Sequence, residues 1–429
     1  MKNSLSKYLL ITACTLFALP MALQILSFSG NYLGGHTEKT PKPIWSLDDW
    51  LSGNFQSQSE KYLSEKYGLR TAMILLHNQY QFSFFKKTNV VSVIIGKENY
   101  LYEEGYIDAF IGSDSFDEEG VKMKVKRLND VNNKLKEMGK KIVVARAAGK
   151  ASYFSEYIPD RYFPKRKKNI IDAYKNALLN SQLNYIDFND WFREMKDTTR
   201  YPLFSKTGIH WSEYGVTLAM DSLIKYLEKV QNVDLPDLKI TSIKTNQKAS
   251  NSDKDIEKSM NLIFDIENGN YAYPAFEIDT TNKDSLHVLA VGDSYYLSMY
   301  DKGFSNKVFD ESQFLYYGRM VYPEKKELKE YDLMEIINKY DVFLLMCTES
   351  NLPHFPWGFH SGMYELLCKE DIDLFVQNHL EEIEEMEEKI RQDKNWYDLI
   401  VKQAETQKTS IEEELRRDAL YMVEASYLK

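Results

Sequence analysis

Short apolar runs that alternate with helical stretches constrain the fold of this 429-residue chain more than any other feature. The runs 141–147, 287–291 and 341–347 are almost continuously apolar. Strands of this kind are buried on both faces, as in parallel sheets covered by helices. Between them, stretches such as 118–138 and 214–230 place apolar residues at helical spacing. We therefore expect an α/β fold in which a mainly parallel sheet lies between two helical layers, a three-layer sandwich.

Two stretches do not follow this alternation. Residues 239–283 are rich in Lys, Asp, Asn, Ser and Thr, and we expect an irregular or short-stranded excursion there. Residues 371–429 contain neither glycine nor proline and place apolar residues such as Trp396 and Leu415 at helical spacing. This stretch is predicted to be a helical C-terminal extension, either an amphipathic helix pair packed on the domain or a docking helix for a partner.

The first thirty residues predict export. Lys2 and Lys7 precede an uncharged run from 8 to 28, which is close to the ~20 residues that a helix needs to cross a bilayer. The positive-inside rule places the two lysines in the cytoplasm and the following domain outside, in the periplasm or at the cell surface. We expect an uncleaved membrane anchor. A cleaved signal peptide, which would release a secreted form, is the alternative.

The predicted organisation has four parts along the chain. A membrane anchor or signal segment at 1–30 is followed by a linker at 31–44, a folded domain at 45–370 and the helical extension at 371–429. The net charge of -10 gives no basic surface for nucleic acid. Only three cysteines are present, so disulfides do not define the fold. The sequence contains no metal-ligand spacing, and no metal or other cofactor is expected.

A serine at the end of one apolar strand is the first candidate catalytic residue. The run 289–291 stops at Gly292-Asp293-Ser294, and residues compatible with a helix follow. A serine at a strand-to-helix turn places its hydroxyl at the carboxyl edge of the sheet, where α/β folds bind ligands. The first amides of the helix can stabilise an oxyanion there. Since these three residues are also common in helix N-caps, the motif alone allows either role.

A histidine upstream is the candidate base. His210 lies in Thr207-Gly208-Ile209-His210-Trp211, directly before the predicted helix at 214–230. A histidine in such a loop can present one imidazole nitrogen to a serine and the other to an orienting group. The alternative is a structural histidine packed by Trp211. We expect His210 to deprotonate Ser294.

Together these motifs resemble the alginate O-acetyltransferase family of AlgJ and AlgX type. The catalytic domain of that family looks like an SGNH hydrolase in which the histidine motif precedes the serine motif, and the order is the same here. The resemblance covers residues 45–356. Further similar motifs occur in the family's order, namely Tyr67-Gly68-Leu69-Arg70, residues 95–102, Ala148-Gly149-Lys150 and residues 348–352.

The resemblance implies an SGNH hydrolase-like fold and an O-acyltransferase, with acetyl as the expected group. The acceptor would be a hydroxyl of an exported polysaccharide or cell-envelope glycan, and Ser294 would carry the acyl group as an ester. The resemblance also implies a partner, a multipass membrane-bound O-acyltransferase that supplies acyl groups. Two alternatives remain open. One is a carbohydrate esterase that uses the same residues, and the other is a non-catalytic glycan-binding scaffold.

One departure from the family affects the predicted site. The family's histidine motif is Asp-x-His-Trp, but Gly208 stands at the position of the aspartate. The third member of the triad therefore has no counterpart at this position. Asp187, at the end of its own strand, and Glu349 are the substitutes that we expect. Orientation by a backbone carbonyl and a domain that only binds are the other two explanations.

The remaining site residues are assigned to the oxyanion and the substrate. The Ser294 amide is the first expected oxyanion donor, followed by Gly318 or Arg319 in a segment that resembles the lining of the family's site. Asn351, in the motif after the last strand, is expected to contact the oxyanion or the substrate. Three aromatic residues are candidates for stacking on sugar rings or for the core, namely Tyr316, Tyr317 and Trp357.

Overall fold

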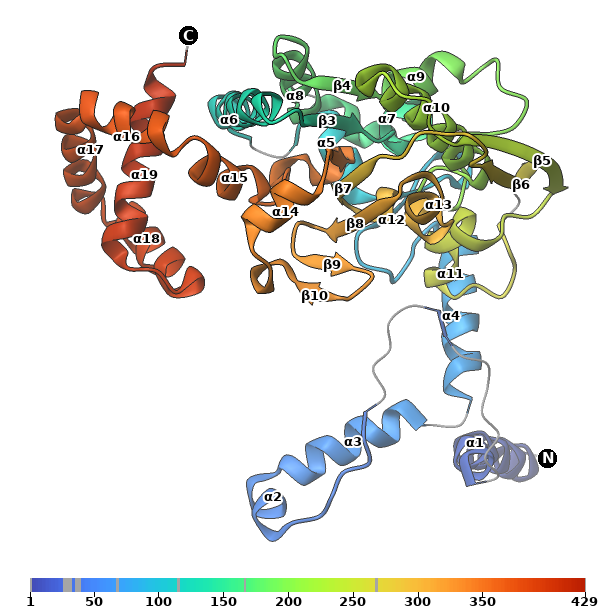
Figure 1. The fold of residues 1–429 in the computed structure, drawn as a ribbon. Helices are drawn as coiled ribbons and strands as arrows, with labels where there is room; N and C mark the ends of the chain where they lie inside the picture. Colours follow the sequence, from blue (N-terminus) through green and yellow to red (C-terminus); the bar gives the residue numbers. More distant parts are fainter. Residues whose placement is uncertain are drawn as a thin grey trace. The chain divides into compact units, whose positions relative to one another are not determined.

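The chain forms two compact units in a computed structural model that describes residues 2–25, 33–34, 40–66, 69–113, 116–165, 167–266 and 269–428 (Figure 1). The first unit comprises Met1–Glu104, Ser205–Ile209 and Gln247–Asn270. The second comprises Gly105–Phe204, His210–Asn246 and Tyr271–Lys429. Two short later segments therefore pack with the N-terminal residues. The four parts predicted from the sequence follow chain order instead and stay a prediction.

A seven-stranded sheet forms the centre of the second unit, with the strand order β10-β9-β8-β7-β11-β3-β4 (Figure 1). The five parallel strands are β3 (Lys141–Arg146), β4 (Asn184–Asp187), β7 (His287–Gly292), β8 (Glu311–Tyr316) and β11 (Val342–Cys347). The edge strands β9 (Met320–Tyr322) and β10 (Lys326–Glu327) pair antiparallel. The predicted α/β fold is confirmed, while the antiparallel edge makes the sheet mixed rather than wholly parallel.

Both faces of this sheet are buried. On one face, a large apolar cluster joins the sheet to α6 (Glu118–Glu137), α8 (Ile170–Leu179), α14 (Leu333–Lys339) and α15 (Phe359–Leu367). Leu289 and Leu345 belong to this cluster, whereas their neighbours Val288 and Leu344 are buried on the opposite face. Successive side chains of a strand point to opposite faces, so a strand buried on both is apolar throughout.

Capping side chains fix where the helices of the second unit begin. Asn169 Oδ1 accepts the Asp172 amide at 2.9 Å at the start of α8. Ser212 Oγ accepts the Gly215 amide at 3.0 Å at the start of α10 (Glu213–Gln231). Each bond satisfies a helix amide that has no partner within the helix. The cap of α10 lies two residues after His210 and so fixes the end of the histidine loop.

The excursion in the middle of the chain is more regular than predicted. Strands β5 (Asp237–Asn246) and β6 (Tyr271–Asp279) form a two-stranded antiparallel sheet of ten and nine residues. The expectation of an irregular or short-stranded segment is therefore wrong for these residues. Ile240, Thr241, Ile243 and Thr245 supply the β-branched residues that favour a strand, although most of β5 is exposed.

The first unit consists of helices and one short hairpin. Its helices include α2 (Leu47–Ser52), α3 (Asn54–Lys66), α4 (Arg70–Phe85) and α11 (Asp255–Met260), and its hairpin joins β1 (Val93–Ile95) to β2 (Leu101–Glu103). A small apolar core lies among α4, β2 and α11. It contains the buried residues Phe82, Leu101, Ile256, Met260 and Ile266.

The N-terminal helix α1 covers Lys2–Ile25. Within the described ranges, no helix is both long and apolar enough to span a membrane. The predicted transmembrane helix over 8–28 is therefore not supported. Its last three residues, 26–28, lie outside the described part of the chain.

The predicted helical C-terminal extension is confirmed. It contains four helices, α16 (Lys369–Asn378), α17 (Leu380–Gln392), α18 (Lys394–Gln407) and α19 (Ile411–Ser426) (Figure 1). Their apolar stripes meet in a small core of their own, made of Ile383, Ile390, Ile400, Leu415, Ala419 and Val423. An ion pair joins α19 to α6, since Arg127 Nε donates to Glu424 Oε2 at 3.1 Å and only 12% and 5% of these side chains are exposed.

Removing one partner of this buried pair should destabilise the second unit. In Arg127→Leu the Glu424 carboxylate stays buried with Tyr364 as its remaining donor, so we expect a loss of about 3 kcal/mol in the free energy of unfolding. Urea denaturation measures the loss. The matched variant Lys122→Leu removes an exposed pair with Glu119 on the same helix and should cost less than about 1 kcal/mol. Equal losses in the two variants would show that the buried pair contributes no more to stability than the exposed one.

Candidate active site

Ser294 lies at the turn between a strand and a helix, as predicted. Strand β7 ends at Gly292, and helix α12 (Ser294–Asp301) begins at the serine. The intervening Asp293 is the N-cap, and its Oδ1 accepts the Tyr295 amide at 3.0 Å. Because the neighbouring strands β11 and β8 run parallel to β7, the serine is at the carboxyl edge of the sheet.

His210 faces this serine. Its Nε2 lies 2.9 Å from Ser294 Oγ, within hydrogen-bond distance. Its ring also packs against Tyr295, with ring centroids 4.9 Å apart. The structure therefore brings the two predicted catalytic residues together, although 84 positions separate them in the chain.

The tryptophan after the histidine fixes the histidine loop to the serine helix. Trp211 is buried, and its Nε1 donates to Ser298 Oγ on α12 at 2.8 Å. Its ring lies against Tyr295 with a centroid distance of 5.1 Å. Two neighbours in sequence, His210 and Trp211, thus bind two residues one helical turn apart, Ser294 and Ser298. Such a double attachment restricts the rotation of the imidazole relative to the hydroxyl.

Asp293 is a buried carboxylate that joins two strand ends. Its Oδ2 accepts the Thr348 amide at 2.8 Å, the Thr348 hydroxyl at 2.8 Å and Asn351 Nδ2 at 3.0 Å. Together with the Tyr295 amide, four donors compensate the desolvation of a side chain that is wholly buried. Thr348 directly follows β11, so Asp293 has a structural role between β7 and β11.

The other residues assigned to the oxyanion are engaged elsewhere. Asn351 Nδ2 binds Asp293 and, at 3.3 Å, Thr348 Oγ1. The amides of Gly318 and Arg319 donate within the β8–β9 turn to Leu315 and Tyr316 carbonyls, at 3.4 and 3.1 Å. None of these three donors is hydrogen-bonded to Ser294, so their role at the oxyanion stays a prediction.

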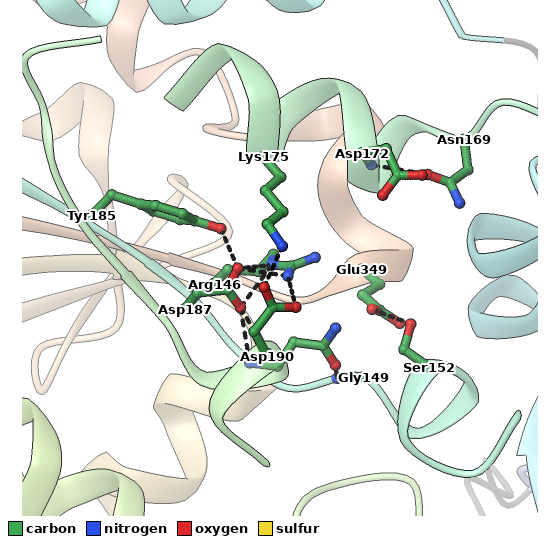
Figure 2. Close-up of polar contacts among 11 residues, drawn as sticks. Arg146, Gly149, Ser152, Asn169, Asp172, Lys175, Tyr185, Asp187, Asp190 and Glu349 are labelled. Carbon is green, nitrogen blue, oxygen red and sulfur yellow. Dashed lines mark hydrogen bonds and ion pairs between the residues drawn. The ribbon is translucent and has the colours of Figure 1, made fainter. Parts of the chain in front are cut away.

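Asp187, the first predicted substitute for the triad aspartate, belongs to an ion pair instead (Figure 2). The residue ends β4, and its carboxylate accepts Arg146 Nη2 at 2.6 Å and the Tyr185 hydroxyl at 2.7 Å. It also accepts the Asn189 and Asp190 amides in the first turn of α9 (Phe188–Met195), each at 3.0 Å. This carboxylate is not hydrogen-bonded to His210. The prediction is wrong because Arg146, its register partner on β3, and the α9 cap take its oxygens.

Glu349, the second predicted substitute, is hydrogen-bonded to Ser152 rather than to His210. The side chain is fully buried, and Oε1 accepts the Ser152 hydroxyl (Figure 2). Within the described residues, Oε2 has no hydrogen-bond partner, and a Cβ at Gly149 would lie only 1.9 Å from it. Burial raises the pKa of Glu349 to about 7, although the Arg146 guanidinium lowers it. This carboxyl therefore keeps its proton to a higher pH than an exposed glutamate does.

The ionisation of Glu349 should make stability depend on pH. An acid with a pKa of about 7 in the folded chain, against an ordinary value of 4.5, holds its proton in the folded state while the unfolded chain loses it. Stability therefore falls as pH rises from 4.5 through 7. Glu349→Gln cannot ionise, so we expect it to match the wild type at pH 4.5 and to exceed its unfolding free energy by about 3 kcal/mol at pH 8. Urea denaturation at both pH values measures this.

An exposed carboxyl provides the control for that measurement. Glu381 lies on the exposed side of α17, and Glu381→Gln should track the wild type at both pH values. If Glu349→Gln also tracks the wild type, the glutamate ionises in the folded chain without a free-energy cost, which contradicts the prediction.

A comparison with protein families connects this geometry to known proteins. Residues 93–261 match the family model described as the SGNH hydrolase-like domain of the acetyltransferase AlgX. This part of the chain is therefore similar to the AlgX-type acetyltransferase domain. The predicted resemblance is thereby confirmed. His210 lies within the matched residues, and Ser294 lies beyond them.

Three solved structures are similar to this chain at low identity. The O-acetyltransferase domain of Pseudomonas putida AlgJ is 15% identical, with a TM-score of 0.44, and the match covers 64% of this chain and 98% of that one. Bacillus cereus PatB1 is 12% identical, with a TM-score of 0.42 and coverage of 61% and 96%. Pseudomonas aeruginosa AlgX is 12% identical, with a TM-score of 0.41 and coverage of 67% and 71%. No curated protein matches.

Gly208, at the position of the family's aspartate, has no room for a side chain. A Cβ added there would lie 2.5 Å from the Ser252 carbonyl oxygen, 2.6 Å from Ser205 Oγ and 2.8 Å from the Asp253 carbonyl carbon. Two of these neighbours are backbone atoms, which cannot turn aside as a flexible side chain does. The AlgX-type aspartate is therefore excluded here by packing within the first unit.

Introducing a side chain at Gly208 should destabilise the first unit. We expect Gly208→Ala to lower the free energy of unfolding by about 2 kcal/mol, because the added methyl group overlaps the 252–253 backbone. Gly269→Ala is the matched control, since a Cβ there meets nothing within 4 Å and should change stability little. Thermal unfolding of the two variants measures the difference. If Gly208→Ala is as stable as Gly269→Ala, the backbone at 252–253 moves aside at little cost and the prediction is wrong.

Three partly buried aromatic side chains lie near Asp293, the residue before Ser294. The rings of Tyr316 and Tyr317 have centroids 4.4 Å apart, and Trp357 lies edge-on to Tyr317 at 5.7 Å. Burial raises the pKa of both tyrosines, and the charge of Asp293 raises them further. Tyr316 is the register partner of Gly292, and the Tyr317 amide donates to the Gly292 carbonyl at 2.9 Å, so both residues lie at the end of β7.

Sequence reasoning missed the residues that hold the site together. Thr348 and Tyr295 bind Asp293, and Ser298 binds Trp211. The available signal was the position of Thr348, the first polar residue after a buried strand.

In the part of the chain that the structure describes, no group of three or more His, Cys, Asp or Glu side chains is placed to hold a metal ion.

Proposed function

We propose that this chain transfers an acetyl group to hydroxyls of an exported polysaccharide or cell-envelope glycan, through an ester on Ser294. The 2.9 Å separation of His210 Nε2 and Ser294 Oγ is the observation that supports this most, because a nucleophile and its base need hydrogen-bond contact. The AlgX-type acetyltransferase family supports the reaction class.

The proposed reaction has two balanced steps. In the first, His210 takes the Ser294 proton as Oγ attacks the acyl carbonyl, and the imidazolium then protonates the leaving group. In the second, His210 takes the proton of a sugar hydroxyl, whose oxygen attacks the ester and releases Ser294, which regains that proton. The Tyr295 amide already binds Asp293, so the Ser294 amide is the first oxyanion donor at this turn.

The substrate side of the proposal rests on the aromatic residues. Tyr316, Tyr317 and Trp357 are partly exposed, and flat rings suit the faces of sugar rings. We also propose that the N-terminal segment with Lys2 and Lys7 holds the domain outside the cytoplasmic membrane. A multipass membrane-bound O-acyltransferase would then supply the acyl group there.

Acetyl transfer by the purified full-length chain tests the proposal. With an acetyl ester donor and an oligosaccharide, we expect acetylated sugar by mass spectrometry, and Ser294→Ala and His210→Ala should each lower the rate roughly a thousand-fold. The exposed controls Ser64→Ala and His77→Ala should leave it unchanged. Acetate release without acetylated sugar would identify an esterase instead. Unchanged cellular glycan acetylation in Ser294→Ala would identify a non-catalytic scaffold.

A further inference from the structure

Helix α4 of the first unit exposes a row of large apolar side chains. Met73, Leu76, Tyr80 and Phe84 recur at spacings of three and four residues, which places them on one face of the helix. Each of the four is between 49% and 73% exposed. The rings of Tyr80 and Phe84 pack on each other with centroids 5.1 Å apart. Single exposed apolar residues are ordinary, but a continuous row marks a surface that binds something.

The opposite face of the same helix is packed. Phe82 lies half a turn away from the exposed row and is buried in the apolar core of the first unit. Asn78, also on this side, donates its Nδ2 to the Met260 carbonyl at 2.8 Å. These contacts fix the rotation of α4 about its own axis. The apolar row cannot turn inward without breaking them.

A neighbouring loop adds to the exposed apolar surface. Gln79 Oε1 accepts the amides of Ile263 and Phe264, each at 3.0 Å, and so holds this loop beside α4. Both side chains of the loop are exposed. Two segments that lie far apart in the sequence therefore bring apolar side chains to one region of the first unit.

The charge of this region is opposite in sign to that of the whole chain. Residues 69–97 contain four lysine or arginine residues and no aspartate or glutamate, whereas the chain has a net charge of -10. Two of the four, Lys86 and Lys87, directly follow α4 and are exposed. A row of apolar and aromatic side chains beside an excess of positive charge is typical of helices that lie at the surface of anionic bilayers.

We propose that the apolar row of α4 lies on the surface of a bilayer that contains anionic lipids. The helix has 16 residues, fewer than the ~20 needed to cross a bilayer, and its packed face stays in the protein core. It therefore lies in the plane of the surface. A protein partner fits less well, because four side chains expose far less than the about 800 Å² that each partner buries in a stable interface. Lysine is also depleted in such interfaces.

A fluorophore at residue 76 tests the proposal on α4 itself. Leu76→Cys is combined with Cys14→Ser, which removes an exposed thiol, whereas Cys347 and Cys368 are buried. The full-length variant is labelled with nitrobenzoxadiazole and reconstituted into phosphatidylcholine–phosphatidylglycerol vesicles. We expect the emission to rise about two-fold and to be quenched by doxyl-labelled lipids, because the label enters the acyl boundary. The same label at Glu381→Cys, on the exposed side of α17, should show neither change.

Paired lysine variants test the role of charge. Lys86→Gln with Lys87→Gln should lower the quenching at residue 76 by about two-fold or more, because each lysine near an anionic surface strengthens binding roughly five-fold. The matched pair Lys394→Gln with Lys402→Gln removes the same charge from the exposed side of α18 and should leave the quenching unchanged.

Two results would overturn the proposal. Unchanged emission at residue 76 in the mixed vesicles would leave a protein partner as the occupant of the apolar row. Equal emission and quenching in vesicles of phosphatidylcholine alone would show that anionic lipid is not recognised. The label reports on α4 alone, so binding of the chain to vesicles through its N-terminal segment cannot imitate the expected result. Acetyl transfer is measured separately, and its failure would leave this test unaffected.

Discussion

The buried carboxylate of Asp293 is the interaction on which the candidate active site depends. A charge that is wholly buried is tolerated only when donors surround it, and here Thr348, Asn351 and the Tyr295 amide provide them. The end of β7, the start of α12 and the loop after β11 therefore meet at one side chain. Ser294 is the next residue in the chain, so this network of hydrogen bonds also fixes the position of its backbone.

The sheet and the Ser294–His210 pair could be predicted because they depend on local patterns. Continuous apolar runs identify strands buried on both faces, and parallel strands bring their carboxyl ends to one edge. The antiparallel edge could not be predicted, since β9 and β10 have only three and two residues and show no periodicity. The two-stranded sheet of β5 and β6 could not be predicted because most of β5 is exposed and polar.

That Asp187 and Glu349 are engaged elsewhere could not be predicted for a different reason. Asp187 and Glu349 do end or follow strands, as expected, but strand ends alone do not reveal register. Arg146 lies opposite Asp187 on the neighbouring strand and takes its carboxylate. The sequence likewise shows that position 208 is glycine, but not that the backbone at 252–253 fills the space beside it. Contacts between segments more than forty residues apart decide both points.

The tyrosines around Asp293 have a consequence for the charge of the candidate active site. Burial and the nearby negative charge raise the pKa of Tyr106, Tyr316 and Tyr317, so none of these phenols ionises in mildly alkaline surroundings. Their hydroxyls stay neutral and keep their protons for hydrogen bonding. The candidate active site therefore keeps the same charge and the same hydrogen-bond donors at these tyrosines as the surrounding pH changes.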